Sequence, residues 1–534
     1  MQRLFRNTLK YTKFILKKER KNIIICCIAF FIITLAQAYS YADLYSTVDE
    51  RMLIAKSMEN PVMIAMMGPV YGNNNYTVGA LMSNQTLVFT AIAMAIISIL
   101  LVNRNTRGDE ETGRMEGVLS LPMGRVANIL AIIITVIIVN FLFAIFIGVG
   151  LYALGIETMG LNGSMAFGAV MGAAGMIFAS ITALCAQIFS TTRGTLGASF
   201  GLLGIAYLVR AIGDVSNETL ALCSPLGWLL RTEVYVNNHW QYVFFTIIIS
   251  LVIFGLSVYL YSIRDMGRGF IAEKKGKDSA SIFLDNLFDL AVRLLRSNII
   301  IWGIFIFVLG ISYGSLLGDV EKFFESTKIL KEMFSLQGGK TYYEQFISVL
   351  MPITALITTV PTLLIVTKLK SEEKSHRIEI LITRPIARIK LLGSFNVLAI
   401  IASITFQVFF AIGFWYSGVT VVENAVSFRN IVIASISYLP AIWFMLGIAN
   451  FFIGIFPKGS VLIWIYYAYS ALVIVLGKIL QLPDWMQKLS QYEAIPKFPI
   501  EKMTFDNIIL ITVLTVIFLA IGLWGYKNRD LENI

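Results

Sequence analysis

The sequence predicts an all-α polytopic membrane protein with twelve transmembrane helices, arranged as two parallel six-helix repeats. Hydrophobic residues make up 57% of the 534 residues and charged residues only 14%, whereas soluble domains contain about 25% charged residues. The apolar residues gather in blocks of about 18 to 25, the length that crosses a hydrocarbon core of roughly 30 Å. A charged segment also occurs twice, about half a chain apart, which indicates an internal duplication.

The first half, residues 1–263, begins with a strongly basic segment. Residues 1–22 carry eight Lys and Arg residues and one acid, Glu19, with apolar residues interleaved. This pattern predicts an amphipathic elbow helix that lies on an anionic inner leaflet before turning into the first span. Six spans are then expected at 23–41, 85–103, 127–153, 165–189, 195–212 and 242–263.

A polar cytoplasmic linker with a second elbow helix, 264–297, separates this half from the second, 298–534. Residues 282–296 precede the seventh span as residues 1–22 precede the first. Arg264-Asp265 and Arg529-Asp530 each follow the sixth span of a half. Because each half has an even number of spans, the halves keep the same orientation and are parallel repeats. The second set of spans is expected at 298–316, 346–367, 391–416, 430–456, 460–480 and 507–526.

Basic residues predict the orientation. With both termini inside, the inside segments hold about three times as many Lys and Arg residues as the outside loops, as the positive-inside rule requires. The net charge of +10 therefore needs no nucleic-acid partner. We expect a multi-pass protein of the bacterial cell (inner or plasma) membrane, with both termini cytoplasmic.

The repeated segment has the frame Glu-x3-Arg-x-Glu-x5-Pro-x2-Arg, and its two copies are 263 residues apart (388 minus 125). Both copies lie between the second and third span of their half, on the expected cytoplasmic face. Five residues at fixed spacing are unlikely to recur by chance. The first copy consists of Glu110, Arg114, Glu116, Pro122 and Arg125, and the second of Glu373, Arg377, Glu379, Pro385 and Arg388.

Each copy predicts one short amphipathic helix. Glu110 and Arg114 stand four residues apart with the acid first, the favourable order for a helical ion pair, as do Glu373 and Arg377. The prolines, Pro122 and Pro385, should end the helices. The apolar residues at helical spacing share one face in each copy: Met115, Val118 and Leu119 in the first, and Ile378, Leu381 and Ile382 in the second.

Enzyme chemistry has no support in the sequence. Gly339-Lys340-Thr341 resembles the end of a phosphate-binding loop, but Phe334 occupies the place of the required glycine. We expect no catalytic residue, no metal site and no cofactor in this chain.

Ionisable residues are scarce within the spans, whereas ion-coupled carriers need them at membrane depth. Arg210 and Asp214, at the outer end of the fifth span, could snorkel to the interface and form a local ion pair, or form a polar gate at the outer mouth.

Small and aromatic residues in the spans have two interpretations each. The glycines of the fourth and fifth spans favour tight helix packing, with a sliding surface as the alternative. The aromatic residues of the eleventh span favour packing or interfacial anchoring, with an apolar transport route as the alternative. These residues are Gly168, Gly172 and Gly175, then Gly197, Gly201 and Gly204, and finally Trp464, Tyr466, Tyr467 and Tyr469.

Further short matches, in order along nearly the whole chain, carry a family resemblance. They are Asn60-Pro61, Gly68-Pro69, the repeated motif, Ser224-Pro225-Leu226-Gly227-Trp228, Arg264-Asp265-Met266-Gly267, Tyr438-Leu439-Pro440-Ala441 and Leu482-Pro483-Asp484-Trp485, followed by Leu489-Ser490, Ile495-Pro496 and Pro499. The chain resembles an ABC-2-type exporter permease, and more narrowly the polyketide-antibiotic exporters typified by tetronasin-resistance permeases.

The resemblance implies a membrane subunit driven by a separately encoded ABC ATPase, expected as a dimer that binds ATP and Mg on the cytoplasmic face. Both motif copies would be coupling helices that contact this partner, and all ten motif residues are candidates for ATPase coupling. The substrate would be a hydrophobic or amphiphilic compound such as an antibiotic, and membrane lipid surrounds the protein. His376 replaces the glycine found at Gly113, so the two couplings need not be equivalent.

Two other functions are compatible with the sequence. One is an ion-coupled secondary multidrug carrier, which can also have twelve spans in parallel halves. The other is a sensor or scaffold that binds a drug without transporting it. The sequence identifies no substrate-binding residue.

Overall fold

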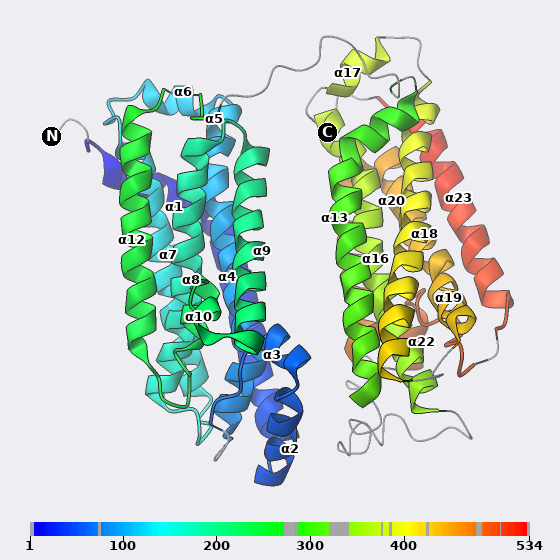
Figure 1. Cartoon of the computed structure of the whole chain (residues 1–534). Coiled ribbons are helices and arrows are strands. Elements are labelled where there is room, and N and C mark those ends of the chain that lie inside the picture. Colours follow the sequence, from blue (N-terminus) through cyan, green and yellow to red (C-terminus); the bar gives the residue numbers. More distant parts are fainter. Residues whose placement is uncertain are drawn as a thin grey trace. The chain divides into compact units, whose positions relative to one another are not determined.

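The chain folds into two compact helical units, residues 1–276 and 277–534, each described here by itself (Figure 1). The computed structural model describes residues 5–72, 76–265, 267–271, 284, 286–319, 341–374, 377–383, 387–422, 427–476, 483–501 and 503–530. Within these ranges the backbone is helical, with no strand beyond an isolated bridge between Phe189 and Ile271. Twelve helical segments are long and apolar enough to cross a membrane, which confirms the predicted number.

Six of these segments belong to the first unit. They are α1 (Thr8–Leu44), α4 (Val78–Asn103) with its extensions η1 (Arg104–Gly108) and α5 (Asp109–Glu111), α7 (Ala127–Ala153), α8 (Leu161–Ile188), α9 (Thr192–Ser216) and α12 (Trp240–Ile263). Shorter helices join them: α2 (Val48–Met58), α3 (Pro61–Met67), α6 (Arg114–Leu119), α10 (Glu218–Ala221) and α11 (Pro225–Leu230).

The second unit repeats this order. Its spans are α13 (Leu287–Ser315) with η2 (Leu316–Asp319), α16 (Tyr342–Lys374), α18 (Arg388–Val421), α19 (Phe428–Ile436) with α20 (Leu439–Ile455), η3 (Pro457–Ser460) with α21 (Val461–Leu476), and α23 (Asp506–Asn528). Two short helices, α17 (Arg377–Ile382) and α22 (Asp484–Lys488), lie between spans. The tenth span is interrupted between α19 and α20, just before Pro440, which lacks a backbone N–H for the helix ladder.

The expected elbow helix is not a separate element. Residues 8–22 belong to α1, which runs for 37 residues without a break. At 1.5 Å per residue, such a helix is about 55 Å long, well beyond the roughly 30 Å of a hydrocarbon core. The basic end of α1 therefore extends past the apolar layer as a continuation of the first span. Residues 287–296 are likewise the start of α13.

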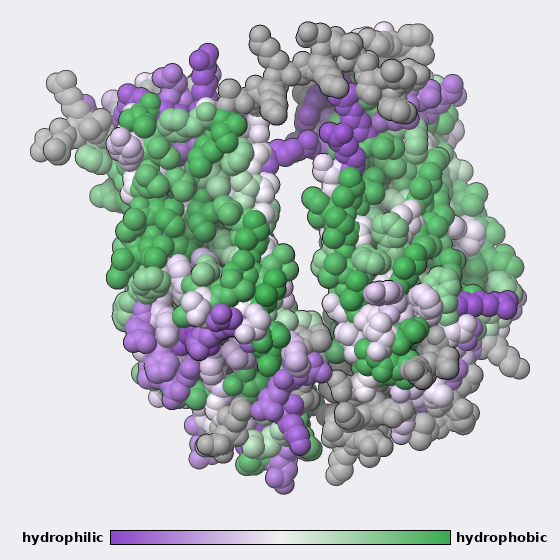
Figure 2. All heavy atoms as spheres, viewed as in Figure 1, coloured by the Kyte–Doolittle hydropathy of each residue, from purple (hydrophilic) through white to green (hydrophobic). Residues whose placement is uncertain are grey.

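Apolar side chains cover the sides of each unit and polar ones gather at its ends (Figure 2). In the first unit α8 is the central helix, with 83% of its apolar window buried, whereas the window of α1 is 11% buried. The glycines of α8 explain this packing. A Cβ atom at Gly168 would lie 2.1 Å from the carbonyl oxygen of Ala144 in α7, and one at Gly175 would lie 1.7 Å from Asn140 Oδ1.

The glycines of α9 behave differently from those of α8. A Cβ atom at Gly197, Gly201 or Gly204 would meet no atom within 4 Å in the structure. Close helix packing is therefore the role of the α8 glycines, and the equivalent prediction for α9 is not met within the first unit. Spacing alone could not separate the two cases, because it does not show which face of a helix has a neighbour.

Tyrosines of α21 serve as anchors for the segment that follows it. Tyr466 donates to the carbonyl oxygen of Leu489 (2.9 Å) and Tyr469 to that of Met486 (2.7 Å). Tyr467 donates to the carbonyl oxygen of Leu356 in α16 (3.1 Å). These contacts give the aromatic cluster a packing role.

Replacing Gly168 with alanine should destabilise the first unit by about 1–3 kcal/mol, because the added methyl group would collide with the backbone of α7. The matched control is Gly201→Ala, which adds the same methyl group where space is open. Thermal unfolding of the purified variants in one detergent measures the difference. Equal melting temperatures for the two variants would contradict the packing assigned to α8.

Candidate functional site: the duplicated charged motif

The first motif copy forms two short helices in place of the single one predicted. α4 passes through a π-helical turn, η1, into α5, and α6 begins only after Gly113. Gly113 adopts φ 70°, in the left-handed region that residues other than glycine rarely occupy. This residue breaks the helical register between Glu110 and Arg114. The apolar face of α6 is as expected, since Met115 is buried and Val118 packs against a small core that contains Tyr11 and Ile15.

The predicted ion pair between Glu110 and Arg114 is wrong. The Glu110 carboxylate accepts two bonds from Arg264, at 2.6 and 3.2 Å, and one from Arg107 at 2.7 Å. Its side chain is only 7% exposed. Arg114 instead approaches Asp109, at 3.7 Å. A buried carboxylate needs buried cationic donors to offset its lost hydration, and Arg264, at the end of α12, supplies a pair of them.

The second copy repeats this exchange of partners. Glu373 lies in the last turn of α16 and accepts from Arg529, which follows α23, at 2.6 Å. Arg377 pairs with Glu372 at 3.1 Å. The predicted pair between Glu373 and Arg377 is therefore also wrong, because α16 ends at Lys374 and the two residues do not share a helix.

The last arginine of each copy bonds to the backbone beside this ion pair. Arg125 donates to the carbonyl oxygen of Arg264 (3.4 Å), and Arg388 donates to that of Arg529 (2.8 Å). We call each set of three residues a latch: Glu110, Arg264 and Arg125 in the first unit, and Glu373, Arg529 and Arg388 in the second. Each latch joins the second span, the start of the third span and the end of the sixth span of its unit.

A cation next to each latch also bonds to a backbone carbonyl near the junction of the fourth and fifth spans. Arg107 donates to the carbonyl oxygen of Ala186 near the end of α8 (2.6 Å). Lys370 donates to the carbonyl oxygen of Pro457, just past the end of α20 (2.6 Å). Arg107 and Lys370 are separated by the motif's own repeat distance, 370 minus 107, or 263 residues. The duplication therefore preserves contacts outside the motif itself.

Six of the described motif residues are exposed, among them Arg125, although its guanidinium donates to the backbone of Arg264. Arg114 and Arg377 have side chains that are 68% and 62% exposed, and Glu116 and Glu379 are also exposed. Pro122 is exposed and follows the end of α6. Pro385 and His376 lie outside the described residues.

Sequence reasoning missed Asp109 and Glu372, which hold the exposed arginines, and the role of Arg264 and Arg529. The Arg-Asp pairs after the sixth spans were visible in the sequence as a sign of duplication. The contact between these arginines and the motif was not visible in the sequence, because nothing in the spacing relates Glu110 to a residue 154 positions later.

The opposite end of the first unit contains a second buried charge cluster. Arg210 in α9 is fully buried and contacts Asp214 at 3.4 Å, and Arg231 contacts Asp214 at 3.8 Å and Glu218 at 3.1 Å. The hydroxyl of Tyr71 accepts from Arg231 (3.2 Å); burial raises the pKa of this hydroxyl, against the opposing effect of Arg231. Arg210 therefore forms the expected local ion pair, but it does so inside the unit and does not snorkel to the interface.

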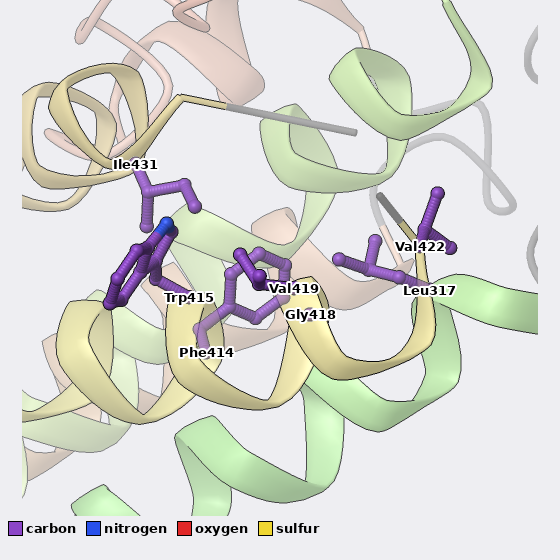
Figure 3. A pocket seen from close by; sticks show the side chains of 7 residues that line it. All are labelled: Leu317, Phe414, Trp415, Gly418, Val419, Val422 and Ile431. Carbon is purple, nitrogen blue, oxygen red and sulfur yellow. The ribbon is translucent and has the colours of Figure 1, made fainter. Parts of the chain in front are cut away.

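The second unit has a small apolar hollow between α18, α19 and η2 (Figure 3). Leu317, Phe414 and Trp415 are among its lining residues, and its volume is about 10 Å³. This volume admits one water molecule at most. The hollow is therefore no binding site for a drug-sized compound.

Comparisons with known proteins agree with this duplicated membrane architecture. Residues 13–261 and 284–527 match the family described as the multidrug efflux system permease Rv1217c, C-terminal domain. The multidrug efflux system permease protein Rv1217c of Mycobacterium tuberculosis (strain ATCC 25618 / H37Rv) is 27% identical over 535 residues, covering 99% of this chain and 96% of that protein. Both matches include both motif copies. The chain therefore belongs to the Rv1217c family of multidrug efflux permeases and is a multi-pass membrane protein.

Proposed function

We propose that this protein is the membrane subunit of an ABC-2-type exporter, which moves hydrophobic or amphiphilic compounds outward with energy from separately encoded ATPase subunits. The observation that carries the proposal is the pair of latches. Each joins the ends of three spans beside a short charged helix, α6 or α17, whose arginine and second glutamate stay exposed. A partner protein that binds these helices could move each unit as a whole.

The two helices each expose charged side chains that a protein partner can bind. Arg114 is braced by Asp109, and Arg377 by Glu372, so each guanidinium is held near the surface without being buried. Bracing of this kind lowers the conformational entropy that a long side chain loses on binding. Arg114 with Glu116, and Arg377 with Glu379, form the proposed docking surface of the first and of the second unit, which we expect on the cytoplasmic face from the positive-inside bias.

The pairing of charged residues within the spans also favours an energy source outside this chain. Arg210 and Asp214 are bonded to each other, and the Glu110 and Glu373 carboxylates are each held by arginine. Proton-driven carriers rely on acids that bind and release protons at membrane depth. In this chain these three acids are instead each paired with an arginine of the same unit.

Reversing both exposed arginines, in the double variant Arg114→Glu and Arg377→Glu, should weaken association with the ATPase about tenfold or more, because like charges would then face the partner. The measurement is co-purification of the chain with the ABC ATPase encoded nearest to it. The control is Arg429→Glu, which reverses an exposed cation elsewhere in the second unit. Unchanged association of the double variant would exclude these arginines from the interface.

Breaking a latch should have a different effect from changing the docking surface. Glu110→Gln removes the charge that holds Arg264 and should destabilise the first unit by about 3–5 kcal/mol, the usual effect of leaving a buried charge unpaired. In a membrane preparation where the variant still folds, we expect the ATPase to stay bound while ATP-driven dye transport falls. Melting temperature, co-purification and transport are measured on the same sample.

The charge exchange Glu110→Arg with Arg264→Glu tests the same contact without removing it. Partial recovery of the melting temperature relative to either single variant is expected, because the two side chains can pair again. If Glu110→Gln instead abolished ATPase binding at normal melting temperature, Glu110 would belong to the docking surface and the latch would be refuted.

Transport in reconstituted liposomes separates the three candidate functions. An exporter requires the ATPase and ATP to move an amphiphilic dye such as ethidium. A secondary carrier would move the dye in response to an ion gradient without ATP. A sensor or scaffold would bind the dye and alter ATP hydrolysis without moving it.

A further inference from the structure

Residues 8–21, which form the beginning of α1, present two contrasting faces. Five basic side chains of this section are exposed, and two large apolar side chains, Leu9 and Phe14, lie among them at 70% and 55% exposure. The inward face is buried and carries Tyr11, Ile15 and Glu19. The exposed basic residues, which we call the basic face of α1, are Lys10, Lys13, Lys17, Arg20 and Lys21.

The inward face packs on the segment that contains α6. Tyr11 and Ile15 form a small core with Ala131 and Ile132 of α7, and Val118 and Met123 close its edge. The backbone adds two bonds just before α1. The Asn7 side chain donates to the carbonyl oxygen of Pro122 (2.9 Å), and the Gly124 N–H donates to that of Arg6 (3.1 Å).

An ion pair connects the same section of α1 to the docking surface. Lys18 Nζ lies 2.6 Å from Asp109, and Asp109 is the carboxylate that braces Arg114. In the second unit the corresponding carboxylate, Glu372, is paired at 2.7 Å with Lys368. Lys368 belongs to the same helix, α16. The lysine that pairs with this carboxylate therefore comes from a different span in each unit. In the first unit it is Lys18 of the first span, and in the second unit it is Lys368 of the second span.

We propose that the basic face of α1 binds anionic phospholipid headgroups, and that this binding positions α6 through Lys18 and Asp109. A cationic face on the part of α1 that extends past the apolar layer suits contact with anionic headgroups. Each basic residue near an anionic surface strengthens binding about fivefold. The consequence for coupling rests on the proposed function, whereas the lipid binding does not.

Hydrogen exchange of the full chain, without the ATPase, tests the lipid contact. Nanodiscs of phosphatidylcholine are compared with nanodiscs of equal parts phosphatidylcholine and phosphatidylglycerol. Phosphatidylglycerol should slow exchange in residues 5–22 and in 114–124. The variant Lys10→Gln, Lys13→Gln, Lys17→Gln should lose both effects. The matched control, Arg293→Gln with Arg296→Gln, removes exposed cations of α13 and should retain them.

The positioning role of Lys18 has its own signature. In Lys18→Gln, phosphatidylglycerol should still protect residues 5–22, but protection of 114–124 should be lost. Lys18→Arg should restore it, because arginine keeps the charge. Loss of protection in both segments would make Lys18 a lipid contact, and retention in both would show that α6 is positioned without it; either result overturns the positioning inference.

ATP hydrolysis by the complex tests the consequence. Phosphatidylglycerol should raise hydrolysis about threefold or more in the complex with the unchanged chain and leave the triple glutamine variant unaffected. If the chain binds no ATPase, the proposed function fails while the exchange data still decide the lipid contact. If exchange in 5–22 slows only on adding the ATPase, with no response to lipid charge, the basic face is a protein contact and the lipid proposal is wrong.

Discussion

A buried carboxylate held by a guanidinium group organises the end of each unit that carries the duplicated motif. In a medium of low polarity neither charge is stable alone, so Glu110 and Arg264 must remain together, as must Glu373 and Arg529. Because the partners come from the second and sixth spans, each pair joins helices that are far apart in the sequence. Arg125 and Arg388 then add the third span by bonding to the backbone of the same arginines.

This constraint divides the motif between two tasks. The first glutamate of each copy is buried and the last arginine bonds to the backbone of the same unit, and both residues join spans. Arg114 and Arg377 are kept at the surface by neighbouring acids that the motif frame does not include. Under the proposed function, a partner that moves α6 or α17 would act on a helix that lies beside these joined spans, and its displacement would reach the unit through them.

The sequence was sufficient for the spans, the repeat and the apolar face of α6, because hydropathy and spacing determine them directly. It failed for the ion pairs. Spacing four residues apart predicted Glu110 with Arg114, but the left-handed Gly113 interrupts that helix, and burial gives Glu110 a distant partner. The open glycines of α9 show the same limit, since a small residue permits close packing but does not supply a neighbour.

The two units use one motif but do not brace it in the same way. Lys18 reaches Asp109 from another span, whereas Lys368 reaches Glu372 along its own helix, so only the first brace can be altered by movement of α1. Gly113 adopts a left-handed turn, and the matching position of the repeat, residue 376, is a histidine. Identical spacing in the sequence therefore does not require identical responses: α6 is connected to the periphery of its unit through α1, while the described bracing of α17 comes from α16 alone.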